Sequence, residues 1–227
     1  MPKMHISQKT DEPANGRKKS FNKYLALSDV DGTITKGSLV LEHAIYLHNK
    51  GIINLGSLPE RWNNDRKNEK LITELAMAYK KAITGKTLNE LDVDSFLKDY
   101  MEGDHFYSTF ETLKTLQKRR GWDVHLVSGS PEFLVSKFGE KFGFTSKGSV
   151  YHTDEDGRFT GDVDGMFGAS QKAAHVSRLR LKNYKRILAF GDTASDKPLF
   201  DVADHSTLVD PNEDTKQKMN PSTTIYH

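Results

Sequence analysis

Four short apolar runs that stop abruptly at polar or glycine residues most constrain the fold of this chain. They are residues 24–28, which stop at Asp29, residues 124–127, which stop at Ser128, residues 187–190, which stop at Gly191, and residues 206–209, which stop at Asp210. Short apolar runs bounded by turn residues are typical of strands that are buried on both faces of a parallel sheet. The chain is therefore predicted to build an α/β fold around a parallel sheet.

Amphipathic helical patterns lie between these runs. Apolar residues recur at helical spacing in residues 109–120, 132–142 and 171–181, the last of which follows Ser170, a favourable N-cap residue. Strands that alternate with helices predict a Rossmann-like sheet with right-handed connections. Ligands of such sheets bind beyond the carboxyl ends of the strands. The polar residues that end the runs are therefore expected to meet at one edge of the sheet.

Residues 37–104 interrupt this alternation. They contain helical patterns at 39–49, 69–83 and 88–101, without a strand pattern, and glycines separate the pieces. A helical block placed directly after the first strand is expected to act as a cap over the strand-end site, where it excludes water and selects substrates.

The domain organisation follows from these patterns. Turn chemistry at Glu155-Asp156-Gly157 predicts a β-hairpin formed by residues 149–152 and 158–163. The polar start of the chain lacks the apolar segment of a signal peptide and is typical of a flexible tail. The expected domains are a flexible N-terminal tail at 1–20, a discontinuous Rossmann-like core at 21–36 and 105–227, and an all-helical cap at 37–104.

Composition argues against several classes of protein. The mean hydropathy is −0.65 and no apolar run is long enough to span a bilayer, so we expect no membrane partner. The net charge is +2 and no basic stripe carries interleaved aromatic residues, which argues against nucleic-acid binding. The absence of cysteine excludes disulfides and thiolate sites, and it fits a cytoplasmic protein. The oligomeric state is left open.

The segment Asp29-Val30-Asp31-Gly32-Thr33 is the strongest chemical signal. Two carboxylates separated by one residue leave a strand into a glycine turn, and both can face one pocket. A carboxylate can attack phosphorus to form an acyl-phosphate, and a neighbouring carboxyl group can protonate the leaving oxygen and later activate water. The alternative is a turn that only ends the strand. We predict that Asp29 is the nucleophile and that Asp31 is the acid and base.

The segment Ser128-Gly129-Ser130-Pro131 predicts a phosphate-binding turn. It offers two hydroxyls and a flexible glycine before a proline that suits the first position of a helix, with Ser130 as its N-cap. The free N–H groups and the positive dipole end of a helix N-terminus hold phosphate. A plain capping sequence is the alternative interpretation.

Lys172 and the carboxylates after the third run complete the predicted site. Lys172 lies in the first turn of its predicted helix, where a cation is unfavourable unless an anion accompanies it, although a solvated surface lysine is the alternative. Asp192 and Asp196 add two carboxylates to a site that already has two, and such clustering needs a compensating cation. Hard oxygen ligands suit Mg²⁺. The predicted ligands are the side chains of Asp29 and Asp192 with the backbone carbonyl of Asp31.

Together these segments resemble the haloacid dehalogenase superfamily of phosphohydrolases. In order and spacing, Asp29 and Asp31 match the family's first motif, Ser128 its second, Lys172 its third and residues 191–196 its fourth. The helical block between the first two motifs is similar to the family's type-1 cap. The resemblance implies that Asp196 orients Lys172 or water, with Thr193 and Ser195 in support.

The phosphoserine-phosphatase-like branch of that superfamily is the most similar, because residues 157–165 resemble its hairpin before the lysine. That branch places a glutamate nine positions after its nucleophile, and this chain has Ser38 there. The departure argues against phosphoserine itself as the substrate. Ser38 and Glu42, which lie one helical turn apart, are candidate specificity residues.

The predicted activity is magnesium-dependent hydrolysis of a small phosphorylated metabolite through an aspartyl-phosphate. One alternative is a phosphotransferase in which an alcohol replaces water. Another is a non-catalytic phospho-acceptor domain such as a response-regulator receiver, against which Asp31, the helical block and the position of the first motif on the first strand all argue. A binding protein that retains the site without activity is the third.

Overall fold

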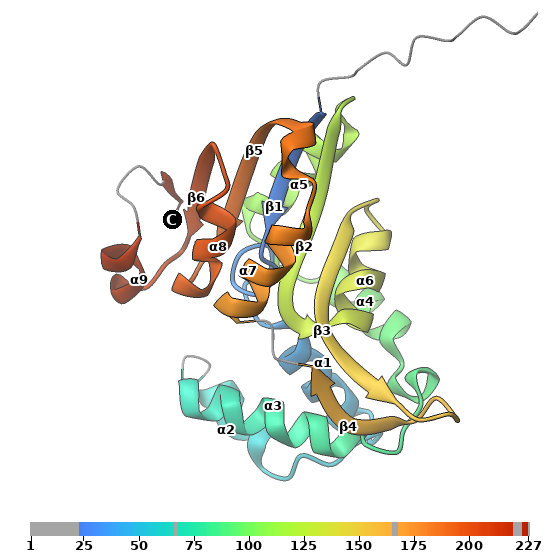
Figure 1. The fold of residues 1–227 in the computed structure, drawn as a ribbon. Helices are drawn as coiled ribbons and strands as arrows, with labels where there is room; N and C mark the ends of the chain where they lie inside the picture. The colour runs from blue at the N-terminus through green and yellow to red at the C-terminus, as the bar shows by residue number, and fades with distance from the viewer. Residues whose placement is uncertain (1–22, 66–67, 165–167, 220–223, 227) are drawn as a thin grey trace, which may run out of the picture.

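A computed structural model describes residues 23–65, 68–164, 168–219 and 224–226, so the predicted tail at 1–20 lies outside the described residues. These residues form a seven-stranded sheet in the order β4-β3-β2-β1-β5-β6-β7 (Figure 1). The strands are β1 (Lys23–Ser28), β2 (Trp122–Pro131), β3 (Thr145–Thr153), β4 (Phe159–Asp164), β5 (Tyr184–Gly191), β6 (His205–Val209) and β7 (Thr224–Tyr226). Neighbouring strands are parallel except β3 and β4, which form the predicted hairpin. The predicted α/β fold with a parallel sheet is confirmed.

Helices cover both faces of the sheet and connect its parallel strands. Figure 1 shows α7 and α8 in front of β1 and β5, with α5 behind the sheet and α6 packed beside β3. The helices are α5 (Ser108–Lys118), α6 (Glu132–Glu140), α7 (Ala169–Arg178), α8 (Lys197–Phe200) and α9 (Glu213–Lys218). Within the described part of the chain, no helix combines the length and the apolar character needed to span a bilayer.

The insertion after β1 is helical, as predicted. Its helices are α1 (Leu39–Asn49), α2 (Leu58–Asn64), α3 (Glu69–Ile83) and α4 (Val93–Glu102), with a 3₁₀ turn at Leu88–Leu91. The single helix predicted at 88–101 was wrong, because Asp92 adopts a left-handed conformation (φ 44°) between the 3₁₀ turn and α4. Helix α2 was not predicted. In Figure 1 the insertion lies beyond one end of the sheet, with α3 alongside β4.

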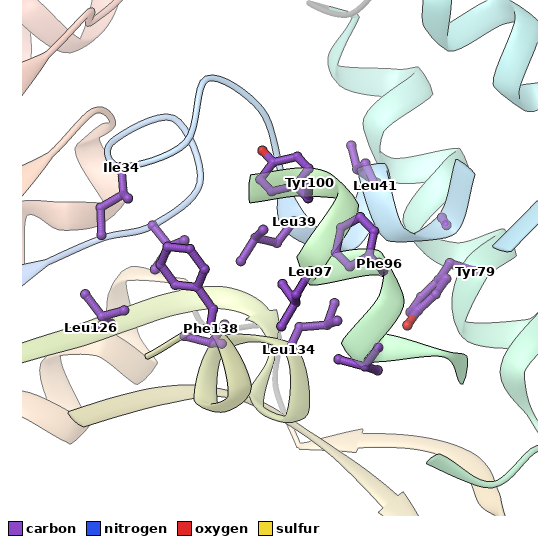
Figure 2. Close-up of a cluster of buried hydrophobic side chains, with 14 of the residues drawn as sticks. Ile34, Leu39, Leu41, Tyr79, Phe96, Leu97, Tyr100, Leu126, Leu134 and Phe138 are labelled. Carbon is purple, nitrogen blue, oxygen red and sulfur yellow. The ribbon is translucent and has the colours of Figure 1, made fainter. Parts of the chain in front are cut away.

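One hydrophobic cluster joins the insertion to the sheet. Figure 2 shows side chains of α1 and α4 packed against side chains of β2 and α6. Leu39 and Leu97 of the insertion and Leu126 and Phe138 of the core are all fully buried in this cluster. Burial of side chains of this size contributes roughly 1.5–3 kcal/mol each. The packing therefore fixes α1, and with it the chain that leaves the first motif.

Two predicted helix starts were wrong. Helix α6 has Pro131 as its N-cap residue instead of Ser130, because β2 continues to Pro131, which pairs with Ser149 of β3. Helix α7 begins at Ala169 with Gly168 in extended conformation as its cap, and Ser170 lies inside the first turn. In both places the strand or loop before the helix, and not the local capping residue, decides where the helix begins.

Helix α7 is attached to the sheet by a pair of imidazoles. Nε2 of His175 on α7 lies 2.7 Å from Nε2 of His125 on β2, and the two rings are stacked. Nδ1 of His125 lies 2.6 Å from Oγ1 of Thr145, whose hydroxyl donates to the carbonyl of Val124. His125 therefore donates through Nδ1 to Thr145 and accepts at Nε2 from His175. Both imidazoles can be neutral in this arrangement.

Acid is expected to destabilise the fold through this pair. Burial and the neighbouring His175 lower the pKa of His125 from 6.5 to about 4. Between these values the unfolded chain binds more protons than the folded one, so the free energy of unfolding decreases as the pH falls, by on the order of 2 kcal/mol between about pH 7.5 and pH 5. Denaturant unfolding at both pH values measures this. In His125→Gln the change in the free energy of unfolding between the two pH values should be smaller by this amount. An unchanged pH dependence would show that His125 is not its source.

Candidate active site

Asp29 is the buried centre of the polar cluster at the carboxyl ends of the strands. It follows β1, and its backbone N–H donates to the carbonyl of Phe190 on β5 (3.0 Å). Nζ of Lys172 donates to Oδ1 of Asp29 (2.7 Å) and to Oδ1 of Asp196 (2.5 Å). The exposed fractions are only 4% for Asp29, 3% for Lys172 and 0% for Asp196. The structure thus brings together residues from three separate segments that sequence reasoning assigned to one site.

Burial makes the charges in this cluster depend on one another. Burial alone would lower the pKa of Lys172, but Asp29 and Asp196 more than offset it and hold the pKa above its usual value. For Asp29, burial raises the pKa to about 8, Lys172 opposes the rise, and Asp196 and Asp31 add to it. Lys172 is therefore a permanent cation, whereas the charge of Asp29 depends on how much positive charge lies next to it.

Three donors orient the carboxylate of Asp31. Its Oδ1 accepts from the backbone N–H of Leu39 (2.6 Å) and from the hydroxyl of Ser130 (3.0 Å), and its Oδ2 accepts from the hydroxyl of Ser128 (2.7 Å). The N–H of Leu39 belongs to the first turn of α1, so the helical insertion contributes directly to the site. Sequence reasoning missed this contact, because a backbone donor carries no residue-type signal.

Ser128 and Ser130, the predicted phosphate-binding residues, lie beside Asp31. Ser130 N–H donates to the hydroxyl of Ser128 (2.9 Å), and the hydroxyl of Ser130 accepts from the N–H of Val40 (3.2 Å). The carbonyl of Gly129 accepts from the hydroxyl of Ser149 (2.7 Å), which ties the turn to β3. The turn is therefore held rigidly at the position where the second motif was predicted to act.

The loop after β5 folds around Asp196. Oδ2 of Asp196 accepts from the N–H groups of Asp192 and Thr193 (3.1 Å each), and the hydroxyls of Thr193 and Ser195 lie 2.8 Å apart. A Cβ atom at Gly191 would lie 2.5 Å from Cβ of Asp196, so only glycine allows this approach. Asp196 thus orients both Lys172 and the loop that carries Asp192. The predicted supporting residues Thr193 and Ser195 belong to this loop.

Asp192 faces the first motif from the neighbouring strand. It accepts from the hydroxyl of Thr33 (3.3 Å), and a Cβ atom at Gly32, whose φ is +83°, would lie only 2.2 Å from Oδ2 of Asp192. Glycine is therefore required at position 32 both by the backbone conformation and by the close approach of the Asp192 carboxylate. Thr33 belongs to the first motif but was not predicted as a site residue.

These carboxylates fit a hard divalent cation. One oxygen from each of Asp29, Asp192 and Asp196 lies within 4.8 Å of the others. Burial raises the pKa of Asp192 well above its usual value, and the charges of Asp29 and Asp196 add to the effect, while Lys172 opposes it. The single positive charge of Lys172 cannot neutralise the three carboxylates of Asp29, Asp192 and Asp196. The donor set, made of oxygen atoms alone, is the one that Mg²⁺ prefers, with a small number of carboxylates and remaining positions for water or phosphate.

Comparison with known proteins identifies the family. The profile of the haloacid dehalogenase-like hydrolase family matches residues 26–201, more than half of the chain. The chain belongs to this family. The resemblance noted in the motifs is therefore confirmed.

One curated relative of this haloacid dehalogenase-like hydrolase matches part of the chain. The phosphoserine phosphatase of Methanocaldococcus jannaschii is 32% identical over 97 residues, which make up 41% of this chain and 46% of that relative. The match thus spans about half the length of the curated relative.

Solved structures show the same fold. A protein of unknown function from Bordetella pertussis Tohama I is similar with a TM-score of 0.70 at 16% identity, covering 91% of this chain and 99% of that one. A phospho-aspartyl intermediate analogue of phosphoserine phosphatase is similar with a TM-score of 0.58 at 20% identity, covering 90% and 92%. The chain therefore shares the overall fold of these two structures.

The predicted specificity residues of this haloacid dehalogenase-like hydrolase lie at the start of α1. Ser38 is the N-cap residue of α1, and its hydroxyl makes no capping hydrogen bond. It directly precedes Leu39, whose N–H donates to Asp31. The carboxylate of Glu42 lies near Gly37, where an added Cβ atom would be 3.2 Å from Oε1. Both residues are therefore close in sequence and in space to the first motif.

Proposed function

We propose that the chain is a magnesium-dependent phosphomonoesterase that acts on a small phosphorylated metabolite through an aspartyl-phosphate on Asp29. The observation that carries the proposal is the buried carboxylate of Asp29, held by Lys172 and followed two residues later by the oriented carboxylate of Asp31. A nucleophile whose position is fixed before the reaction lowers the barrier, because the reacting atoms need no further ordering.

In the first step, an oxygen of Asp29 forms a bond to phosphorus while the bond from phosphorus to the ester oxygen breaks. For this step Asp31 must start in its protonated form, and it gives that proton to the ester oxygen, so that the alcohol leaves uncharged. Lys172 stays at Oδ1 of Asp29 (2.7 Å) and offsets the negative charge that the phosphoryl group brings. Ser128, Gly129 and Ser130, at the N-terminus of α6, would hold the phosphoryl oxygens once the hydroxyls of Ser128 and Ser130 turn away from Asp31.

In the second step, water attacks phosphorus and the bond between phosphorus and Asp29 breaks. Asp31, now a carboxylate, accepts the proton of the water. Inorganic phosphate leaves, and both aspartates return to their starting states. Residues of the insertion that border Asp31 are placed to exclude other water and to contact the leaving alcohol, which makes Ser38 and Glu42 the candidate specificity residues.

Removal of the cation is expected to abolish hydrolysis. A divalent cation held by the side chains of Asp29 and Asp192 and the backbone carbonyl of Asp31 would supply the positive charge that lets a carboxylate approach a phosphate. The test is the rate of p-nitrophenyl phosphate hydrolysis after exhaustive EDTA treatment, followed by titration with Mg²⁺. Ca²⁺ is the control, because it takes longer and less regular ligand distances and should restore less activity. Full activity in EDTA would rule out the metal assignment.

The substrate class is tested with a panel of phosphorylated metabolites in the presence of Mg²⁺. Phosphoserine belongs in the panel because a relative from Methanocaldococcus jannaschii is a phosphoserine phosphatase. An added alcohol acceptor separates hydrolysis from phosphotransfer, since hydrolysis yields inorganic phosphate and phosphotransfer yields a new phosphate ester. The proposal would be overturned if the protein hydrolysed neither any ester of the panel nor p-nitrophenyl phosphate.

A further inference from the structure

A tyrosine and an aspartate that the predicted mechanism does not use form a hydrogen bond at the same edge of the sheet. The hydroxyl of Tyr107 donates to Oδ2 of Asp210 (3.0 Å). Tyr107 is the N-cap residue of α5, where the chain returns from the helical insertion, and Asp210 follows β6. The two residues are far apart in the sequence, and their bond joins the start of α5 to the end of β6.

The bond links the loop after β1 to the end of β6, and β5, which carries Asp192 at its end, is the strand between them. The N–H of Tyr107 donates to the carbonyl of Ile34 (2.9 Å), which anchors it to the loop after β1. In the sheet, β5 lies between β1 and β6, and Gly191 pairs with Leu208, so Asp210 lies one residue beyond the position opposite Asp192. Burial raises the pKa of Tyr107 to about 12, and the charges of Asp210 and Asp192 contribute, as expected if both carboxylates are near its hydroxyl.

The backbone at Asp210 is strained. Its φ is +41°, a left-handed conformation that side chains other than glycine, asparagine and aspartate rarely adopt. The next residue is Pro211, and a residue before proline favours extended conformations. Local strain of this kind is maintained by the surrounding contacts and tends to occur at functional sites. The side chain of Asp210 accepts the hydrogen bond from the hydroxyl of Tyr107 in this conformation.

We propose that Asp210, held by Tyr107, is a positioning residue of the cation site, an inference that rests on the proposed magnesium-dependent function. Its carboxylate adds negative charge next to Asp192 and accepts hydrogen bonds from water around the cation, without touching the cation itself. Partners of this kind keep the ligands oriented and raise the affinity of a site for its metal, and their loss typically weakens binding about ten- to a hundred-fold. Asp210 is exposed, so the expected loss is at the lower end.

The test is the dissociation constant of Mg²⁺, measured by calorimetry on the full chain with the wild type, Asp210→Asn and Tyr107→Phe. Asparagine tolerates the left-handed backbone and can still accept the tyrosine hydrogen bond, so only the charge is lost. We expect Asp210→Asn to weaken binding about ten-fold and Tyr107→Phe by a few-fold. The Mg²⁺ concentration for half-maximal activity should rise in parallel, while kcat at saturating Mg²⁺ stays within about two-fold, because binding and not chemistry is affected.

The chain has a matched control pair. The hydroxyl of Tyr184 donates to Oδ2 of Asp123 (2.8 Å) in the same way, but at the amino ends of β5 and β2. Asp123→Asn and Tyr184→Phe should leave the affinity for Mg²⁺ unchanged. Wild-type affinity in the Asp210 and Tyr107 variants, or equal weakening in the control pair, would overturn the inference. Failure of the wild type to bind Mg²⁺ would instead overturn the proposed function and with it the inference.

Discussion

Replacement of Asp29 by asparagine is expected to reduce hydrolysis of p-nitrophenyl phosphate by at least about a thousand-fold, since loss of a covalent nucleophile removes the reaction path itself. Asparagine keeps the size of the side chain and one oxygen that can accept from Lys172, so the fold should be retained. The measurement is the initial rate at saturating Mg²⁺, with circular dichroism to check folding. Near wild-type hydrolysis by Asp29→Asn would refute the nucleophile assignment.

Asp31→Asn is the matched variant for this prediction, because it removes acid and base catalysis while leaving the nucleophile. The p-nitrophenolate leaving group needs no proton, so the first step should proceed and the second should slow by about 10²- to 10⁴-fold. The covalent intermediate is then expected to accumulate and to appear as one added phosphoryl group in the intact mass. Asp29→Asn should show no such addition under the same conditions.

The sheet and the place of the candidate site could be predicted because both follow from burial. Strands covered on both faces must be apolar along their whole length, and polar residues such as Asp29 and Ser128 can only appear where the strands end. The order of strands and helices then brings those ends to one edge. For this reason the positions of β1, β2, β5 and β6, the edge where their polar ends meet and the helical insertion were predicted, whereas β7 was not.

Details that depend on contacts between distant segments could not be predicted. Ser130 was expected to cap α6, but the pairing of Pro131 with Ser149 extends β2 past Ser130. The hydroxyl of Ser130 instead donates to Asp31, 99 residues away in the sequence. The break at Asp92 and the bond between Tyr107 and Asp210 also have no local signal, because each depends on packing of segments that are remote in sequence. Residue types predicted the candidate site, whereas the hydrogen-bond partners within it required the structure.

Of the substitutions considered, Lys172→Met is expected to lower the free energy of unfolding the most. Lys172 is the buried cation that bonds both Asp29 and Asp196, and removal of one partner from a buried ion pair typically costs about 3–5 kcal/mol. Without it, the pKa of Asp29, already raised by burial, should rise further. A raised carboxyl pKa makes the folded state bind more protons than the unfolded one, so the variant should lose most stability above about pH 8 and less near pH 5.

Denaturant unfolding of Lys172→Met at the two pH values, in EDTA and in Mg²⁺, measures this loss. Because Mg²⁺ binds the same carboxylates, it should restore part of the stability of the variant. The double variant Asp29→Asn with Lys172→Met should be less destabilised than the single variant, since one of the two uncompensated carboxylates is gone. Lys197→Met, which removes an exposed pair with Asp201, is the control and should change stability by less than about 1 kcal/mol. Equal effects of the two lysine substitutions would show that Lys172 does not compensate the buried carboxylates, and the charge balance on which the proposed site depends would then be wrong.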